Sequence, residues 1–110
     1  MGTNYYVVRT RPTIDRPIHI GKSSYGWKFL FQEQEDLWND PPVSWHSWKD
    51  VIKWLTEFTM DNKDYVIIDE YDHTVDLSDF IDLVESKQGE RASEYSKCVD
   101  GYRFTEGDFL

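Results

Sequence analysis

The sequence is poor in cysteine, and Cys98 is its single thiol. One thiol cannot form a disulfide within the chain, and it excludes a zinc site built from several cysteines. A chain without a disulfide framework is typical of a reducing compartment. Long apolar runs are also missing, because no stretch approaches the roughly 18 residues of a membrane span. The opening segment, Met1–Tyr6, lacks the basic and apolar parts of a signal peptide. We therefore expect a protein that does not enter a membrane.

Basic residues are scarce relative to acidic ones, with 12 Lys and Arg against 21 Asp and Glu and a net charge of −9. Residues 1–31 carry a net charge of +4, whereas residues 32–110 carry −13. Direct binding of nucleic acid by the whole surface is not expected, because phosphates need a basic footprint. The acidic part fits either a partner protein with a basic surface, including by mimicry of nucleic acid, or a solvated surface that aids solubility.

Aromatic residues are abundant and make up 16% of the chain, with five Trp and seven Tyr. This content excludes a disordered tail, which is poor in aromatics, and it supplies large side chains for a core. The 110 residues correspond to a single domain, 1–110.

The first third predicts three antiparallel strands in a meander. Strands are expected at Thr3–Arg9, Ile18–Lys22 and Trp27–Phe31, where β-branched and aromatic residues alternate with polar ones. A connection containing Pro12 and Pro17 and a turn at 23–26 join them.

The rest of the chain predicts two helices and short strands. Residues 32–43 read as a loop, and Ser44 or Ser47 caps a helix whose apolar residues are Trp48, Val51, Ile52, Leu55 and Phe58. Further elements are expected as a strand at 65–69, a short strand at 74–76, a helix capped by Ser78 and a loop at 89–98. Residues 102–104 are expected either to form a final short strand or to pack against the sheet. The predicted fold is α+β, with a small antiparallel sheet (the meander plus one or two later strands) packed against two helices.

Motifs for catalysis or metal binding fail on inspection. The histidines, His19, His46 and His73, have no partner at the spacing of a helical zinc site. Gly21-Lys22-Ser23 resembles the end of a phosphate-binding loop, but it lacks the earlier glycine and the following helix. Asp69-Glu70-x-Asp72 lacks the alternating ligands and glycine of a calcium loop. No catalytic residue, metal or cofactor is expected, although an enzyme using His19, Lys22 and Asp69–Glu70 stays a lesser alternative.

A ligand site is expected around the turn that follows the second strand. Lys22, Ser23 and Ser24 are suited to hold an anion with the turn amides, and Trp27 is suited to stack a base. His19 and Arg103 are expected to complete this site. The competing interpretation is an ordinary hairpin turn with Lys22 facing solvent.

A partner-binding surface is expected from tryptophans and acids. Trp38 and Trp45 flank the Pro41–Pro42 loop, and Trp54 falls off the core face of the first helix. Aromatic residues outside a core are enriched at interfaces, and the alternative is that the loop folds back and buries them. The acids expected to join this surface are Asp69, Glu70, Asp72, Asp79 and Asp82.

Five short motifs follow one another along the chain: Met1-Gly-Thr-Asn-Tyr-Tyr6, His19-Ile-Gly-Lys-Ser-Ser24, Gly26-Trp27-x-Phe29, Asp69-Glu-Tyr71 and Asp100-Gly-Tyr-Arg-Phe104. In these the chain resembles a family of small bacteriophage proteins that has no established activity. The resemblance covers nearly the whole sequence and implies a phage origin and the host cytoplasm as the site of action. Many members carry a Cys-x-x-Cys pair before the second motif, where residues 10–16 here have no cysteine. Any metal site of such relatives is therefore absent or incomplete in this chain.

Together these observations lead to the hypothesis of a non-enzymatic phage protein that binds and inhibits a host protein with a basic surface, such as a defence or nucleic-acid-handling factor. The alternative is a protein that sequesters a nucleotide-like or phosphate-bearing small ligand. Phage origin is an analogy at the level of source and carries less weight than the residues themselves.

Overall fold

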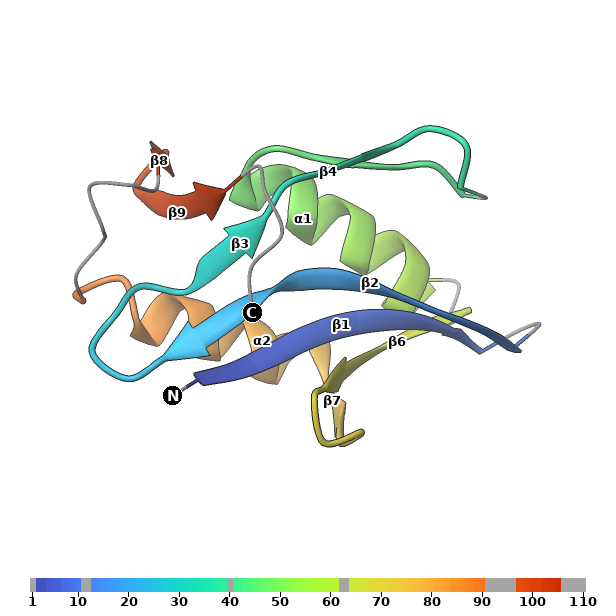
Figure 1. The fold of residues 1–110 in the computed structure, drawn as a ribbon, viewed down its shortest axis with the longest axis horizontal. Helices are drawn as coiled ribbons and strands as arrows, with labels where there is room; N and C mark the ends of the chain where they lie inside the picture. The colour runs from blue at the N-terminus through green and yellow to red at the C-terminus, as the bar shows by residue number, and fades with distance from the viewer. Residues whose placement is uncertain (1, 11–12, 40, 62–63, 91–96, 106–110) are drawn as a thin grey trace.

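A mostly antiparallel sheet with two helices on one of its sides forms the architecture, an α+β fold (Figure 1). The computed structural model describes residues 2–10, 13–39, 41–61, 64–90 and 97–105. Its main sheet has the strand order β7-β6-β1-β2-β3-β9-β8, and β4 and β5 form a separate two-stranded sheet. The strands are β1 (Gly2–Thr10), β2 (Thr13–Ser24), β3 (Leu30–Gln32), β4 (Gln34–Asp36), β5 (Val43–Trp45), β6 (Tyr65–Asp69), β7 (Thr74–Val75), β8 (Lys97–Val99) and β9 (Tyr102–Thr105).

The main sheet is larger than the sequence pattern predicts, with seven strands among the described residues. β2 pairs antiparallel with both β1 and β3, and β6 joins the other side of β1. β9 pairs parallel with β3, which places the C-terminal hairpin beside the first third of the chain. The third strand begins at Leu30 instead of Trp27, and β2 extends through Ser23 and Ser24, which the sequence assigns to a turn.

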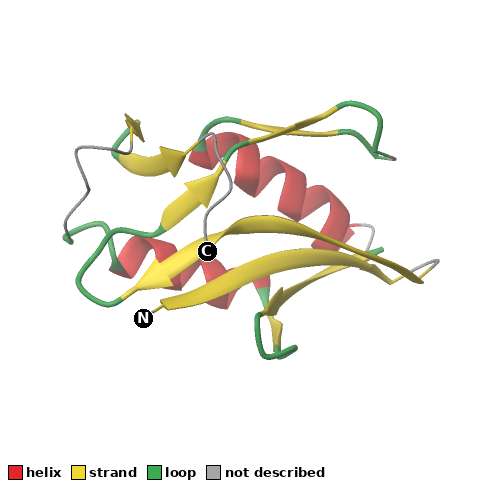
Figure 2. Cartoon of the chain, in the orientation of Figure 1, coloured by secondary structure: helices red, strands yellow, loops and turns green. Residues whose placement is uncertain are grey.

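The core lies between the sheet and the helices, as Figure 2 shows by the position of the helices behind the strands. Val7, Ile20 and Ile67 contribute from the strands because alternate residues of a strand face the same side. Aromatic rings fill the centre: Phe31 lies 4.8 Å from Phe104 and 5.2 Å from Trp48 between ring centroids. The remaining buried members of this core are Phe29, Val43, Trp45, Val51, Trp54, Leu55, Tyr65, Leu77, Phe80 and Val84.

Both predicted helices are present. α1 (Trp48–Leu55) begins after Ser47, whose side chain accepts a hydrogen bond from the Asp50 amide, and it continues into the π-helical segment η1 (Thr56–Asp61). Ser47 and not Ser44 is therefore the cap. α2 (Leu77–Ser86) begins after Asp76, so the expected cap at Ser78 is wrong by two positions. Neither helix in the described part of the chain has the length and apolar character needed to cross a membrane.

Two expected loops contain strands. β4 and β5 pair within and beside the segment 32–43, and Trp45 is held there because its indole N–H donates to the Gln32 carbonyl at 2.8 Å. β8 covers residues 97–99, so only the end of the predicted loop 89–98 can be compared, and residues 91–96 lie outside the described residues. The β8–β9 turn uses Asp100 and Gly101, whose φ angles of 53° and 87° are those of a two-residue hairpin turn.

A close approach of two strands at Gly21 predicts a large cost for adding one methyl group there. An alanine Cβ at position 21 would lie 2.3 Å from the Leu30 carbonyl oxygen and 2.4 Å from the Phe29 ring. Gly21→Ala should therefore lower the free energy of unfolding by about 1–3 kcal/mol, measured by urea denaturation. Gly89→Ala is the matched control, because nothing lies within 4 Å of its Cβ position. Equal stabilities of the two variants would contradict this packing.

Candidate partner-binding site

The loop between β4 and β5 displays two apolar side chains to solvent. Trp38 is 98% exposed and Leu37 is 63% exposed. The backbone beneath them is held by Asp36, whose carboxylate accepts hydrogen bonds from the amides of Trp38 and Asn39, each at 3.2 Å. The Asn39 side chain donates to the Pro41 carbonyl at 2.7 Å. Such side-chain to backbone bonds order a turn, so the exposed tryptophan is presented on a defined backbone.

Three indole and amide hydrogen bonds attach the β4–β5 hairpin to the rest of the fold. Trp45 reaches the end of β3 through its bond to Gln32. Trp54 of α1 donates its indole N–H to the Pro42 carbonyl at 3.1 Å. The Gln34 side chain donates to the His19 carbonyl of β2 at 3.0 Å. The hairpin is therefore fixed to strands and a helix, and its tip projects from a rigid base.

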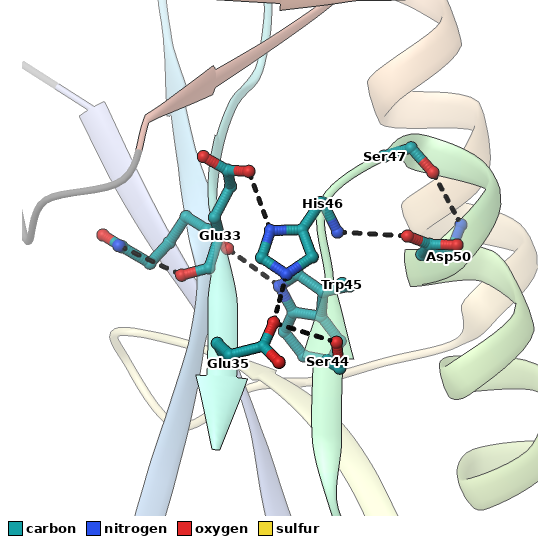
Figure 3. A network of polar contacts seen from close by, with 8 residues as sticks. Glu33, Glu35, Ser44, Trp45, His46, Ser47 and Asp50 are labelled. Carbon is teal, nitrogen blue, oxygen red and sulfur yellow. Dashed lines mark hydrogen bonds and ion pairs between the residues drawn. The ribbon is translucent and has the colours of Figure 1, made fainter. Parts of the chain in front are cut away.

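A histidine connects the two strands at the base of the hairpin (Figure 3). His46 follows β5, and its Nδ1 lies 2.9 Å from Glu33 Oε1, just before β4. Its Nε2 forms a second ion pair with Glu35 Oε2 in β4. The backbone N–H of His46 donates to the Asp50 carboxylate at 3.2 Å, which connects the network to the start of α1. His46 thus connects the strands of the hairpin through its imidazole and reaches α1 through its backbone N–H.

This arrangement favours the protonated form of His46, because only the imidazolium donates from both ring nitrogens. Hydrogen bonds to Glu35 and then to Glu33 raise the pKa of His46 above its ordinary value of 6.5. The hydrogen bond from His46 lowers the pKa of Glu35 below 4.5. The carboxylates face different nitrogens and do not converge, and the described residues contain no group of three His, Cys, Asp or Glu side chains suited to a metal. The network therefore acts as a clamp that holds the base of the hairpin together.

Of the three tryptophans expected at the surface, Trp38, Trp45 and Trp54, only Trp38 is exposed. Trp45 is fully buried, and Trp54 is 8% exposed and belongs to the core. The prediction that Trp54 lies off the core face is wrong, because Pro42 and the ring of Phe58, 4.6 Å away, cover its indole. Trp38 keeps the exposed position that the partner-binding hypothesis requires.

The expected acidic residues lie apart from the hairpin, around β6, β7 and α2 at the lower side of the view in Figure 1. Asp69 supports a turn, because its carboxylate accepts the amides of Tyr71 at 2.8 Å and His73 at 2.9 Å. The Glu70 carboxylate accepts the Asn4 amide at 2.7 Å. Asp72, Asp79 and Asp82 are exposed. These acids shape the field of the molecule more than they build a local site.

The expected ligand residues are only partly brought together. Lys22 and Arg103 each pair with Leu30, so they share the sheet face away from the helices, two strands apart. The Arg103 guanidinium lies 5.2 Å from the centre of the Trp27 ring. His19 is elsewhere, with Nε2 2.9 Å from Asn4 Oδ1 and its ring beside Tyr6. Ser23 and Ser24 are residues of β2, so the turn begins later than expected, at Tyr25 and Gly26, where the Trp27 amide donates to the Ser24 carbonyl at 3.2 Å.

Sequence reasoning missed Leu37 and the His46 clamp. Leu37 is adjacent to Trp38 in the connection between β4 and β5. Because the sequence pattern of residues 32–43 predicts a loop, it does not mark the two as an apolar pair at the tip of a hairpin. The clamp has a weaker signal, since Glu33 and His46 are 13 positions apart and meet only when the hairpin forms.

No protein-family model matches the chain, and no curated protein or solved structure is significantly similar to it.

The clamp predicts a raised pKa for His46 that depends on Glu35. Replacing Glu35 with Gln removes the largest cause of the shift and should lower the pKa of His46, measured by NMR titration of its ring protons. Asp82→Asn, an exposed acid on α2, is the charge-matched control and should leave this pKa unchanged. A pKa of 6.5 or less in the unaltered protein would contradict the clamp.

The sign of the stability effect follows from the two shifts. The contribution of His46 is complete below its unfolded pKa near 6.5 and is lost as the pH rises through its raised folded pKa. The contribution of Glu35 is present above 4.5 and is lost as the pH falls through its lowered folded pKa. The ion pairs at the hairpin base therefore stabilise the fold most between the two unfolded pKa values, 4.5 for Glu35 and 6.5 for His46.

Proposed function

We propose that this chain is a non-enzymatic protein that binds and inhibits another protein, with the Trp38 hairpin as the contact that anchors the partner. The observation that carries the proposal is the 98% exposure of Trp38 on an ordered turn. Exposing an indole ring to water is unfavourable because its apolar surface stays hydrated. Tryptophans buried at interfaces, in contrast, often contribute about 2–4 kcal/mol of binding energy. Leu37 beside it extends the apolar contact.

The charge of the chain supports a basic surface on the partner. Residues 32–110 carry −13, and Glu35 and Asp36 stand immediately before the exposed pair. A field of this sign accelerates the encounter with a basic protein and disfavours acidic ones. The resemblance to small bacteriophage proteins adds the setting to the proposal: a host protein of the cytoplasm, such as a defence or nucleic-acid-handling factor.

A second candidate function is the sequestration of a phosphate-bearing small ligand on the outer face of the sheet. The observation in its favour is the contact between the Arg103 guanidinium and the Trp27 ring. Arg103 and Lys22 both pair with Leu30, so the two cationic residues lie in one row across the sheet. A stacked base and a phosphate are ligands that this pair of residue types favours.

Loss of the exposed indole should weaken partner binding. Trp38→Ser is expected to reduce the affinity for the captured partner at least about thirtyfold, which corresponds to a hot-spot contribution of about 2 kcal/mol. The measurement is a quantitative pull-down from bacterial lysate followed by titration of the recovered protein. Tyr25→Ser is the matched control, because Tyr25 is 95% exposed in the β2–β3 connection, remote from the hairpin.

Capture should also fall with rising salt, because the attraction between exposed charges is screened. An unchanged set of partners for Trp38→Ser, or equal losses for Trp38→Ser and Tyr25→Ser, would refute the hairpin as the binding element.

The second candidate predicts that the purified chain carries or binds a nucleotide-like molecule. A panel of nucleotides should then raise the melting temperature of the protein, and Arg103→Gln should abolish the increase. Lys49→Gln, at an exposed position of α1, is the control and should leave the increase unchanged. Heat extraction followed by mass spectrometry identifies a retained ligand. An empty extract together with no thermal shift across the panel would refute this function.

A further inference from the structure

A groove runs beside the β4–β5 hairpin, between its loop and the outer side of α1 and η1. Its volume is about 490 Å³, within the range of sites that hold a side chain or small ligand. Pro41 and Pro42 form one wall, so the loop that displays Trp38 also borders the groove. The other lining residues are Ser44, Asp50, Lys53, Trp54, Glu57 and Phe58.

The floor of the groove is aromatic and held in place. Trp54 and Phe58 are in ring contact, with centroids 4.6 Å apart. The Trp54 indole is oriented by its hydrogen bond to the Pro42 carbonyl, and it also contacts Trp45 edge-on at 5.5 Å. A floor of this kind offers an apolar aromatic surface, and aromatic rings attract cations.

The rim carries more negative than positive charge. Asp50, Lys53 and Glu57 follow one another at spacings of three and four residues, which places them along one side of the helix, and all three are exposed. Asp50 is fixed by its bonds to the His46 amide and to the cap of α1. Glu57 in η1 stands at the other end of the row, and Lys53 lies between the two acids.

We infer that this groove receives an arginine side chain of the basic partner, next to the contact made by Trp38. The inference rests on the proposed function and names the chemistry that this surface recognises. Arginine suits the groove because its guanidinium is weakly hydrated, stacks on aromatic and apolar surfaces, and still pairs with carboxylates at the rim. Lys53 opposes the same ligand, so it limits the attraction that Asp50 and Glu57 provide.

The test follows the Trp54 indole N–H in ¹⁵N-labelled full-length protein by NMR. The probe is the peptide N-acetyl-Gly-Arg-Gly-amide, and its comparison is the same peptide with citrulline, which has the shape of arginine without the charge. The arginine peptide should shift the Trp54 signal with a dissociation constant roughly in the millimolar range. The citrulline peptide should bind several-fold more weakly, because the ion pair and the cation–aromatic contact are both lost.

Substitutions at the rim should change this affinity in opposite directions. Glu57→Gln should weaken the arginine peptide about two- to fivefold, whereas Lys53→Gln should strengthen it by a similar factor. Asp82→Asn is the matched control, since it removes one exposed acid from α2 without touching the groove. Equal weakening by Glu57→Gln and Asp82→Asn would show attraction to the net charge alone and overturn the inference.

Two further outcomes separate the groove from the hairpin. An unresponsive Trp54 signal, or equal binding of arginine and citrulline peptides, overturns the groove even where Trp38→Ser abolishes capture of the partner. A Trp54 shift with the expected rim effects supports the groove even where Trp38→Ser leaves capture unchanged, in which case the proposed role of the hairpin fails alone.

Discussion

The burial of Trp45 is the interaction on which the functional surface depends. Its indole is fully buried, donates to the Gln32 carbonyl at the end of β3, and contacts Trp54 of α1. One side chain therefore attaches the β4–β5 hairpin to both the sheet and the helical layer. The exposed tip, the His46 clamp and the groove wall all belong to this hairpin, so their geometry relies on that anchor. Burying a ring of this size provides several kcal/mol, which offsets part of the entropy lost in ordering two strands of three residues each.

The clamp and the tip illustrate a division of roles along one short hairpin. At the base, His46 and its two glutamates add ion pairs to the packing of Val43 and Trp45, which are buried in the core. An exposed ion pair such as His46–Glu35 contributes little alone. The histidine gains from its second contact, with the largely buried Glu33 side chain, and from its backbone bond to Asp50. At the tip, Asp36 orders the backbone that carries Leu37 and Trp38. Polar bonds thus set the shape of the hairpin, and the apolar side chains at its tip stay exposed to solvent.

Charge is distributed by layer as well as along the chain. The first third, with its net charge of +4, forms β1, β2 and the approach to β3, whereas the acidic remainder supplies the hairpin and both helices. Lys22 and Arg103 share the outer sheet face on either side of β3, and Asp50 and Glu57 line the groove on the helical side. The two candidate functions therefore occupy different faces of the fold. The acidity that dominates the composition bears on the hairpin side, through steering and through the groove rim.

Local patterns in the sequence determined the α+β class, the first two long strands and both helices, because period-2 and period-3.6 spacing reports directly on which residues are buried together. The sequence also singled out Trp38. Only the tertiary structure decided that Trp45 and Trp54 are buried, since the covering groups, the Gln32 and Pro42 carbonyls, come from segments more than ten positions away. The pairing of His46 with Glu33 and the parallel addition of β9 to β3 were equally undetermined, because contacts between distant segments leave no local spacing.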